Sequence, residues 1–267
     1  MKKMNTLFMC AFISVTAFAA EVYTYNTPAD WEKKAVIKVL PDGVLEFAGK
    51  QDITTAKSFK VDPRKKVTFS FEIRAREDSI DTMVYAGFQQ QDSDKIILEP
   101  IYVRQEVGSL TTLTEDAKAG ATKLKIRKPR RWIKPIYRGY YIVFDAKKDL
   151  SDLPNPSGIA LAAEKDLPDG IVEITLKKPL PKDYPAGSQV RFHIGGPYMY
   201  SALDAKKLSS EWIKVSCTIT GTDPAAMDFK KWWIGTKYAK PLFLLNYRDF
   251  AKQKAVQIRN IKITVED

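Results

Sequence analysis

The sequence predicts an all-β protein organised as an antiparallel β-sandwich. The first observation is the strict alternation of apolar and polar residues over residues 67–74, where Val67, Phe69 and Phe71 share one face. The second is that many such short segments recur along the chain, separated by turn residues. Only a few short stretches, such as residues 28–34, have the character of a helix. Many short strands with turns at these intervals are typical of a sandwich or jelly roll.

The N-terminal segment predicts export. Lys2 and Lys3 precede an apolar run over residues 7–15, and Ala17-Phe18-Ala19 follows as a small-x-small cleavage site. We therefore expect residues 1–20 to be a signal peptide and the mature chain to be periplasmic, at the cell surface or extracellular. The apolar run is shorter than the roughly 18 residues that a membrane-spanning helix needs, so we expect no transmembrane segment.

The strands of the sandwich are expected in two groups, one on each side of a central region. In each group, apolar residues alternate with polar ones or form short apolar runs bounded by turns. The first group comprises residues 44–48, 67–74, 84–88 and 95–98, and the second comprises residues 212–219, 241–247 and 256–265. We assign the sandwich to residues 21–108 and 193–267.

The central region, residues 109–192, has a different pattern. Residues 110–114 and 123–126 are expected to be short strands joined by a turn that contains Gly120, which indicates a hairpin. Six prolines between residues 154 and 185 make this region richer in loops than its flanks. Further strands are expected over residues 138–144, 171–176 and 184–190. We predict a small β-barrel-like module inserted into an exposed loop of the sandwich, where insertions are tolerated.

The composition restricts the chemistry and the partners. The formal charge is +11, and removal of Lys2 and Lys3 leaves +9, which favours anionic partners such as acidic polysaccharide. After cleavage the chain keeps one cysteine, Cys217, and one histidine, His193, so we expect neither an intramolecular disulfide nor a transition-metal site. The basic cluster at residues 127–131 has the composition of a nucleic-acid patch, but export argues against nucleic acid as a partner.

Several segments resemble a known group of secreted proteins. They are Val61-Asp62-Pro63, Tyr85-Ala86-Gly87-Phe88, and the closing element from Gly235-Thr236-Lys237-Tyr238-Ala239 to Ile261-Lys262-Ile263. These segments resemble carbohydrate-binding-module-like jelly rolls of the galactose-binding-like group of sandwiches. Residues 110–126 and 185–190 resemble small β modules of extracellular and surface-fibre proteins. The resemblance implies a galactose-binding-like sandwich and a role in glycan binding, with no particular ligand.

Aromatic and polar side chains near the returning strands are the candidate ligand-binding residues. Sugar rings pack their C–H faces on aromatic rings, while their hydroxyls form hydrogen bonds with amide, carboxylate and guanidinium groups. Adjacent residues of an extended chain face opposite ways, so we expect one of Trp232 and Trp233 in the core and the other exposed. The candidates are Tyr198, Tyr200, Trp232, Trp233, Asn246 and Arg248. The predicted function is non-catalytic binding of polysaccharide, with acidic glycans favoured by the charge.

Two alternative functions remain open. Arg191, His193, Tyr198 and Tyr200 supply the residue types of a polysaccharide lyase, which needs a base and a cationic group that neutralises a uronate. The motifs of jelly-roll alginate lyases, Arg-Thr/Ser-Glu-Leu-Arg and Gln-Ile-His, are absent. The other alternative is a structural or adhesive surface protein that contacts a protein partner through a face of the sandwich.

No organic cofactor is expected, but one turn is a candidate for a structural calcium. Jelly-roll modules of the type that the chain resembles often hold such an ion. The segment Gln91-Asp92-Ser93-Asp94 brings Asp92 and Asp94 together, and hard cations bind clustered oxygen atoms. The segment lacks the loop of an EF-hand, and turns of this composition are also common without a metal.

Overall fold

The computed structural model describes residues 20–131, 139–247 and 254–267. Residues 1–19 of the expected signal peptide and the candidate ligand residue Arg248 lie outside these ranges. Within them, no helix is both long enough and apolar enough to cross a membrane.

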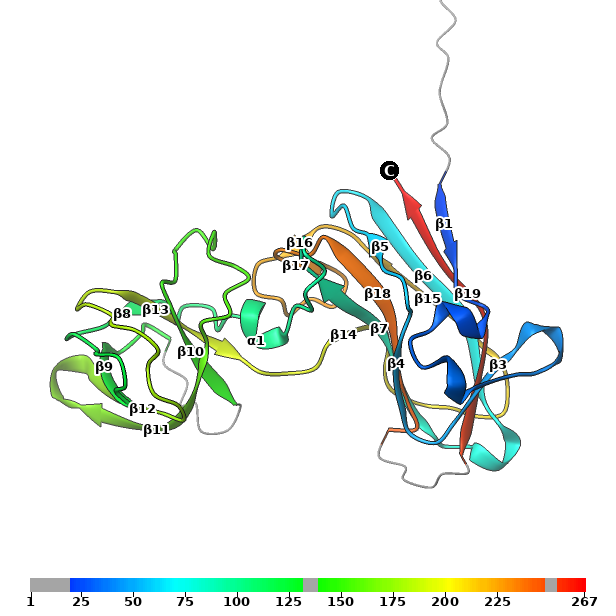
Figure 1. Cartoon of the computed structure of the whole chain (residues 1–267), viewed down its shortest axis with the longest axis horizontal. Helices are drawn as coiled ribbons and strands as arrows, with labels where there is room; N and C mark the ends of the chain where they lie inside the picture. The colour runs from blue at the N-terminus through cyan, green and yellow to red at the C-terminus, as the bar shows by residue number, and fades with distance from the viewer. Residues whose placement is uncertain (1–19, 132–138, 248–253) are drawn as a thin grey trace, which may run out of the picture.

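Two antiparallel sheets form the predicted sandwich, which the structure confirms (Figure 1). The six-stranded sheet has the order β15-β6-β19-β3-β2, with β1 added along β19. Its strands are β1 (Glu21–Thr24), β2 (Ile37–Val39), β3 (Leu45–Ala48), β6 (Lys66–Ala75), β15 (Ile213–Ile219) and β19 (Ala255–Glu266). The five-stranded sheet has the order β14-β7-β18-β4, with β5 added along β18. Its strands are β4 (Gln51–Thr54), β5 (Phe59–Lys60), β7 (Met83–Gln91), β14 (Met199–Lys207) and β18 (Tyr238–Leu245).

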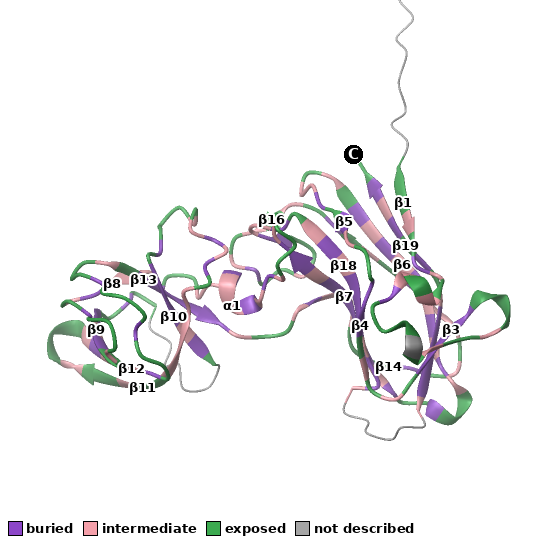
Figure 2. Cartoon of the chain, viewed as in Figure 1, coloured by how far each residue is buried: buried purple, intermediate pink, exposed green. Residues whose placement is uncertain are grey.

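Aromatic side chains fill the space between the two sheets. Phe69 of the six-stranded sheet packs against Phe88 and Phe243 of the five-stranded sheet, with ring centroids 5.2 Å and 5.7 Å apart. The alternation predicted for residues 67–74 is present, because β6 buries every second residue (Figure 2). Burial of these large rings stabilises the fold. Within the described ranges the one cysteine, Cys217, is a free thiol.

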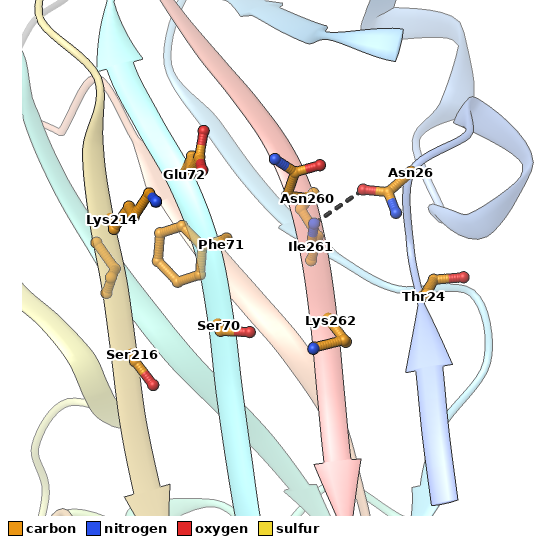
Figure 3. A pocket seen from close by; sticks show the side chains of 11 residues that line it. Thr24, Asn26, Ser70, Phe71, Glu72, Lys214, Ser216, Asn260, Ile261 and Lys262 are labelled. Carbon is orange, nitrogen blue, oxygen red and sulfur yellow. Dashed lines mark hydrogen bonds between the residues drawn. The ribbon is translucent and has the colours of Figure 1, made fainter.

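The outer face of the six-stranded sheet carries a groove with a volume of about 510 Å³ (Figure 3). It crosses β15, β6, β19 and the end of β1, and its floor lies over Ser70 and Ser216. The outer face of the five-stranded sheet points in the opposite direction, because the two sheets share one core.

A third sheet forms a separate lobe beside the sandwich (Figure 1). Its order is β8-β13-β10-β11-β12-β9, and all its ladders are antiparallel. Its strands are β8 (Thr111–Thr112), β9 (Lys123–Arg127), β10 (Tyr140–Phe144), β11 (Ile159–Leu167), β12 (Ile171–Leu176) and β13 (Gln189–Ile194). These strands and their connections, residues 111–194, are called the inserted lobe below. Its apolar side chains form a hydrophobic cluster of their own, distinct from that of the sandwich.

The sheet of the inserted lobe curls without forming a closed barrel within the described residues. Its two edges meet at a single bridge between Leu113 and Ile126, supported by a hydrogen bond from the Thr114 N–H to the Lys125 carbonyl at 3.0 Å. The boundary expected between residues 192 and 193 falls inside β13, which pairs with β10 from Val190 to Ile194.

Two short linkers join the lobes, one through helix α1 (Pro100–Val103) and the other after β13. The linkers are held together because the Ile194 N–H donates to the Arg104 carbonyl at 2.9 Å. The buried guanidinium of Arg104 donates to the Ala226 and Pro197 carbonyls at 3.1 Å and 3.3 Å. Its positive charge also lies over the Trp233 ring, 6.0 Å from the centroid. These contacts connect the linkers to the sandwich.

Some local elements differ from the sequence prediction. Residues 95–98 do not form a strand but contribute one bridge, between Ile97 and Gln91, because the chain turns at Lys95 with a positive φ of 63°. The helical character expected over residues 28–34 appears as two 3-10 turns, η1 (Pro28–Asp30) and η2 (Lys34–Val36). The remaining short elements are η3 (Pro41–Gly43), η4 (Glu77–Ser79), η6 (Pro168–Gly170), β16 (Thr222–Asp223) and β17 (Trp232–Trp233).

Candidate functional site

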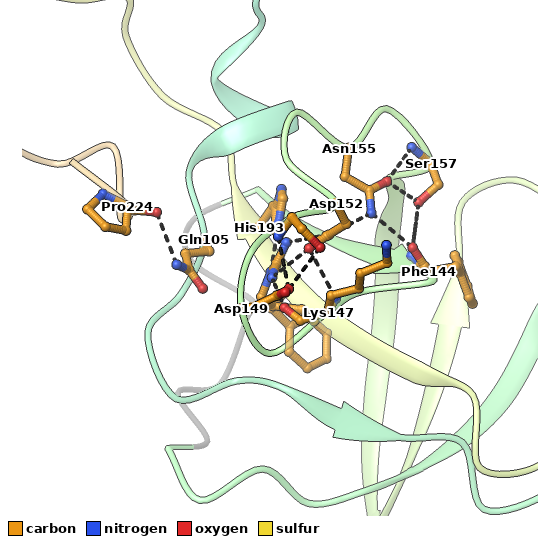
Figure 4. A network of polar contacts seen from close by, with 12 residues as sticks. Gln105, Phe144, Lys147, Asp149, Asp152, Asn155, Ser157, His193 and Pro224 are labelled. Carbon is orange, nitrogen blue, oxygen red and sulfur yellow. Dashed lines mark hydrogen bonds and ion pairs between the residues drawn. The ribbon is translucent and has the colours of Figure 1, made fainter. Parts of the chain in front are cut away.

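His193 lies in a polar network inside the inserted lobe (Figure 4). Its side chain is fully buried, and its Nδ1 lies 2.7 Å from the Ile101 carbonyl oxygen. Because a carbonyl only accepts, Nδ1 carries the proton, and Nε2 accepts a hydrogen bond from Arg191 Nε at 3.1 Å. Burial lowers the pKa of His193 to about 4, so the ring is neutral.

The charge of Arg191 is balanced inside the same network. Arg191 is 1% exposed and forms an ion pair of 2.7 Å with Asp152. It also donates to the Lys147 carbonyl at 3.2 Å, while Asp152 accepts from Asn155 Nδ2 at 3.0 Å. A buried ion pair keeps its charges only when further hydrogen bonds satisfy them, which is the arrangement found here. The network fastens the loop after β10 to β13 and, through His193, to helix α1.

The residues of the lyase hypothesis do not meet in one site. A catalytic base must come within hydrogen-bond reach of its substrate, but His193 is sealed from solvent and both of its ring nitrogens contact protein groups. Tyr198 instead donates its hydroxyl to the Glu99 carboxylate, at 3.0 Å and 3.1 Å from the two oxygens. Tyr200 lies against Tyr85 on the sandwich, as described below.

The expectation that one of the two adjacent tryptophans is exposed was wrong. Trp232 and Trp233 are 0% and 1% exposed, and both belong to the core cluster of the sandwich. Trp232 packs on Phe88, with ring centroids 5.2 Å apart, while Trp233 faces the guanidinium of Arg104. The two indoles do face different ways, as expected for adjacent residues of an extended chain. Trp233 is nevertheless buried, because Arg104 of the linker to the inserted lobe lies over its ring. Neither ring is accessible to a sugar.

Asn246 is also buried, and both ends of its side-chain amide form hydrogen bonds with neighbouring groups of the protein. It follows β18 with a φ of 52°, in the left-handed region that asparagine tolerates. Its Nδ2 donates to the Gly49 carbonyl and its Oδ1 accepts from the Thr82 hydroxyl. A ligand could reach this amide only by displacing these contacts, so the structure gives Asn246 a role in shaping a turn.

Asp92 and Asp94 lie on a turn at the end of β7. The Asp92 carboxylate accepts hydrogen bonds from the backbone N–H groups of Asp94 and Ile96, both at 2.9 Å. This is the ordinary use of aspartate in a turn. Among the described residues, no group of three or more His, Cys, Asp or Glu side chains is arranged to hold a metal ion.

Three tyrosines form a row on the outer face of the five-stranded sheet. The ring of Tyr85 lies 4.9 Å from that of Tyr200 and 5.3 Å from that of Tyr247, centroid to centroid. All three rings are partly exposed. We call Tyr85, Tyr200 and Tyr247 the tyrosine row.

The alternation of β7 places Tyr85 on this face. Its neighbours Val84 and Ala86 are fully buried in the core, so the Tyr85 side chain projects to the opposite side of the sheet. Across the ladder, Tyr85 is paired with Leu244, and Leu244 is paired with Asp52 on β4. Tyr85 is therefore followed across the sheet by the aliphatic side chain of Leu244 and then by the exposed carboxylate of Asp52.

Gly87 allows the second tyrosine to lie above the first. The backbone of β14 passes so close to Gly87 that a Cβ atom there would collide with the Met199 carbonyl and the Tyr200 Cα. The ladder between β14 and β7 shifts register at this point, which marks a bulge. The bulge places the Tyr200 ring over Tyr85.

Polar groups surround the tyrosine row. Lys50 Nζ lies 5.5 Å from the centroid of the Tyr247 ring, and Tyr198, which donates to Glu99, immediately precedes β14. Burial raises the pKa of Tyr200 to about 12, with Asp52 adding to the effect, so its hydroxyl keeps its proton at neutral pH. The face thus combines a cluster of rings in tilted and edge-on contact with hydrogen-bonding groups at its edges.

Sequence reasoning found Tyr200 but missed its partners. Tyr85 and Tyr247 are more than a hundred residues apart in the chain, and only the pairing of β7 with β18 brings them together. The alternation around Tyr85 was a usable signal, since it places this ring opposite the core residues Val84 and Ala86.

Comparison of the chain with protein-family models, with curated proteins and with solved structures finds no match. The function must therefore be argued from the residues themselves.

Proposed function

We propose that this protein is exported and binds polysaccharide without cleaving it, with the tyrosine row as the contact surface. The observation that carries the proposal is the cluster of three partly exposed rings, in tilted and edge-on contact, on the outer face of the five-stranded sheet. The expected galactose-binding-like character of the sandwich is part of the same proposal.

The chemistry of the row suits a sugar. Phenol rings provide flat apolar surface for the C–H face of a pyranose, and their hydroxyls provide hydrogen bonds at the edge. Asp52 and Lys50 are exposed beside the rings and offer an acceptor and a donor for sugar hydroxyls. A sheet face that is open at its surface also accommodates a chain that continues in both directions, as a polysaccharide does.

The test is affinity electrophoresis of the purified protein in gels that contain neutral polysaccharides. Retardation is expected for the native protein. Substitution Tyr85→Ala or Tyr200→Ala is expected to weaken binding by about tenfold, since an aromatic contact worth about 1.4 kcal/mol corresponds to that factor. The matched control is Tyr141→Ala, which removes a partly exposed ring from the inserted lobe.

Three results would contradict the proposal. One is that the native protein is retarded in none of the gels. The second is that Tyr141→Ala weakens binding as much as Tyr85→Ala. The third is release of unsaturated sugar products from a uronate-containing polysaccharide, seen by their ultraviolet absorbance and abolished by His193→Ala, which would favour a lyase instead.

A further inference from the structure

The groove on the six-stranded sheet is lined mainly by polar and charged side chains (Figure 3). It lies on the side of the sandwich opposite to the tyrosine row. Its volume of about 510 Å³ is in the range of pockets that hold small ligands. The lining residues that matter to a ligand are Asn26, Ser70, Glu72, Lys214, Ser216 and Lys262.

The groove exists because small side chains face outward at the centre of the sheet. Ser70 on β6 lies between Ser216 on β15 and Lys262 on β19 in the ladder. In the next outward-facing row, Thr68 is paired with Thr218, and their hydroxyl oxygens lie 3.1 Å apart. The sheet is therefore hollowed where it carries hydroxyl groups, and longer side chains rise on both sides of the floor.

The floor and one wall of the groove carry side chains that can form hydrogen bonds with a ligand. The Asn26 side chain is fixed because its Oδ1 accepts the Ile261 N–H at 2.8 Å, and its NH₂ group is then a donor at the groove wall (Figure 3). Asn260 adopts a φ of 55° at the register shift of β19, so this wall is a β-bulge. Hydroxyl and amide groups of this kind match a ligand that carries many hydroxyls.

The rim of the groove is positively charged. Lys214 and Lys262 are exposed on opposite sides of the floor. The carboxylate of Glu72 is neutralised by Arg259, whose Nε lies 2.7 Å away, and this hydrogen bond is the main reason that the pKa of Glu72 is lowered. Beyond Arg259, the Trp212 ring has guanidinium carbons on two sides, Arg259 at 4.2 Å and Arg74 at 4.6 Å from its centroid.

Four cationic side chains, Lys214, Lys262, Arg259 and Arg74, thus surround Glu72, the one carboxylate that lines the groove. Glu46 on the same sheet does not change this balance, because it is buried and paired with Arg76 at 3.6 Å and with Gln257 at 2.8 Å. The exposed Glu266 lies further along β19, where it is paired with Lys66. The charge is local to the groove rather than a consequence of the net charge alone.

We propose that this groove is a binding site for an anionic saccharide, with a carboxylate or sulfate group held between Lys214 and Lys262 and sugar hydroxyls on Ser70 and Ser216. The site is independent of the tyrosine row. The partner is a saccharide rather than a general polyanion because the floor presents hydroxyl and amide groups. It needs no aromatic platform, since the charge supplies affinity and the hydroxyl floor supplies selectivity.

The experiment measures binding by calorimetry with four probes. They are an oligogalacturonate, its fully methyl-esterified form, a sulfated galactan oligosaccharide and inorganic polyphosphate. We expect binding of the first or the third probe and none of the neutral ester. Comparison of the first and third probes distinguishes a carboxylate ligand from a sulfate ligand. Equal binding of polyphosphate would overturn the assignment to a saccharide.

Two variants locate the site. The double substitution Lys214→Gln, Lys262→Gln is expected to weaken binding at least tenfold, whereas Lys148→Gln, Lys178→Gln in the inserted lobe changes the net charge equally and is expected to leave binding intact. Ser216→Leu keeps the charge and fills the floor, so it should also abolish binding. Equal loss in both double variants, or full binding by Ser216→Leu, would overturn the proposal.

The outcomes separate this site from the tyrosine row. The tyrosine variants are tested with neutral polysaccharides, whereas the lysine variants are tested with anionic oligosaccharides. Failure of either proposal therefore leaves the other measurable.

Discussion

His193 illustrates how its surroundings decide what a reactive side chain does. As the lone histidine of the chain it was the natural candidate for a base, but its two ring nitrogens are engaged by Arg191 and by the Ile101 carbonyl. Trp232 and Asn246 follow the same rule, because both are enclosed and contact only protein. Tyr200 differs, since part of its ring remains at the surface.

The burial of His193 predicts a pH-dependent stability. Its pKa is about 4 in the folded chain, against an ordinary value of 6.5, so the unfolded chain binds more protons between these pH values. The stabilising contribution is complete above pH 6.5 and is lost as the pH falls toward 4. The loss amounts to about 3 kcal/mol, since each unit of pKa corresponds to about 1.4 kcal/mol.

Urea denaturation at a series of pH values measures this effect. The free energy of unfolding of the native protein should fall between pH 6.5 and 4, and His193→Gln should remove most of that slope. Asp152, whose pKa is lowered by its hydrogen bonds and by Arg191, is present in both proteins and contributes at the acidic end. The same slope in both proteins would contradict the prediction.

Strand β7 contributes side chains both to the core and to the outer face of the five-stranded sheet. Its even-numbered residues from Val84 to Phe88 are buried, and its odd-numbered positions form the outer face with Tyr85. Gly87 has no side chain on that face, and the backbone of β14 occupies the vacant space. The bulge in β14 is therefore encoded by a glycine in the neighbouring strand rather than by β14 itself.

Gly87→Ala is expected to disturb this crossing. The new Cβ would meet backbone atoms of β14, which cannot move aside as a flexible side chain can, so we expect a loss of about 1–3 kcal/mol in the free energy of unfolding. Displacement of Tyr200 should also weaken polysaccharide binding. Chemical denaturation and affinity electrophoresis measure the two effects.

Gly195→Ala is the matched control for Gly87→Ala. At Gly195 the nearest atom to an added Cβ is the Gly139 carbonyl oxygen at 3.5 Å, an ordinary contact distance. If both variants unfold at the denaturant concentration of the native protein, the bulge does not depend on Gly87.

The two proposed binding surfaces lie on opposite faces of the sandwich. The tyrosine row lies on one outer face of the sandwich and the groove of the six-stranded sheet lies on the other. The inserted lobe lies beside the sandwich (Figure 1). Arg104 and His193 lie at the linkers and connect the lobes through hydrogen bonds to backbone carbonyls. Each lobe contains its own hydrophobic cluster, so we expect each lobe to be stable without the contacts between them.

Excision of the inserted lobe tests this separation. Residues 105–194 can be replaced by a short Gly-Ser linker, because the Ile194 N–H donates to the Arg104 carbonyl and the two ends are adjacent. The shortened sandwich is expected to unfold cooperatively and to keep its binding of neutral polysaccharide. The isolated segment 105–194 is expected to fold alone. Absence of fixed tertiary structure in either piece, seen by near-ultraviolet circular dichroism, would contradict this expectation.

The sequence by itself determined the fold class, and it did so through periodicity. Residues 67–74 alternate strictly, and β6 buries every second side chain. Strands such as β11 and β14 were not predicted, because several neighbouring residues in each are partly exposed and no clean period of two appears. Local pattern specifies a strand only where one face of that strand is buried.

Only the tertiary structure decided which of the candidate side chains are accessible. Whether Trp233 is covered depends on Arg104, which is distant in sequence, and Tyr85 meets Tyr200 and Tyr247 only through the pairing of β7 with its two neighbours. The groove likewise needs Ser70, Ser216 and Lys262 on three adjacent strands. Side-chain exposure and contacts between rings depend on how distant segments pack together, and the order of residues along one segment does not specify them.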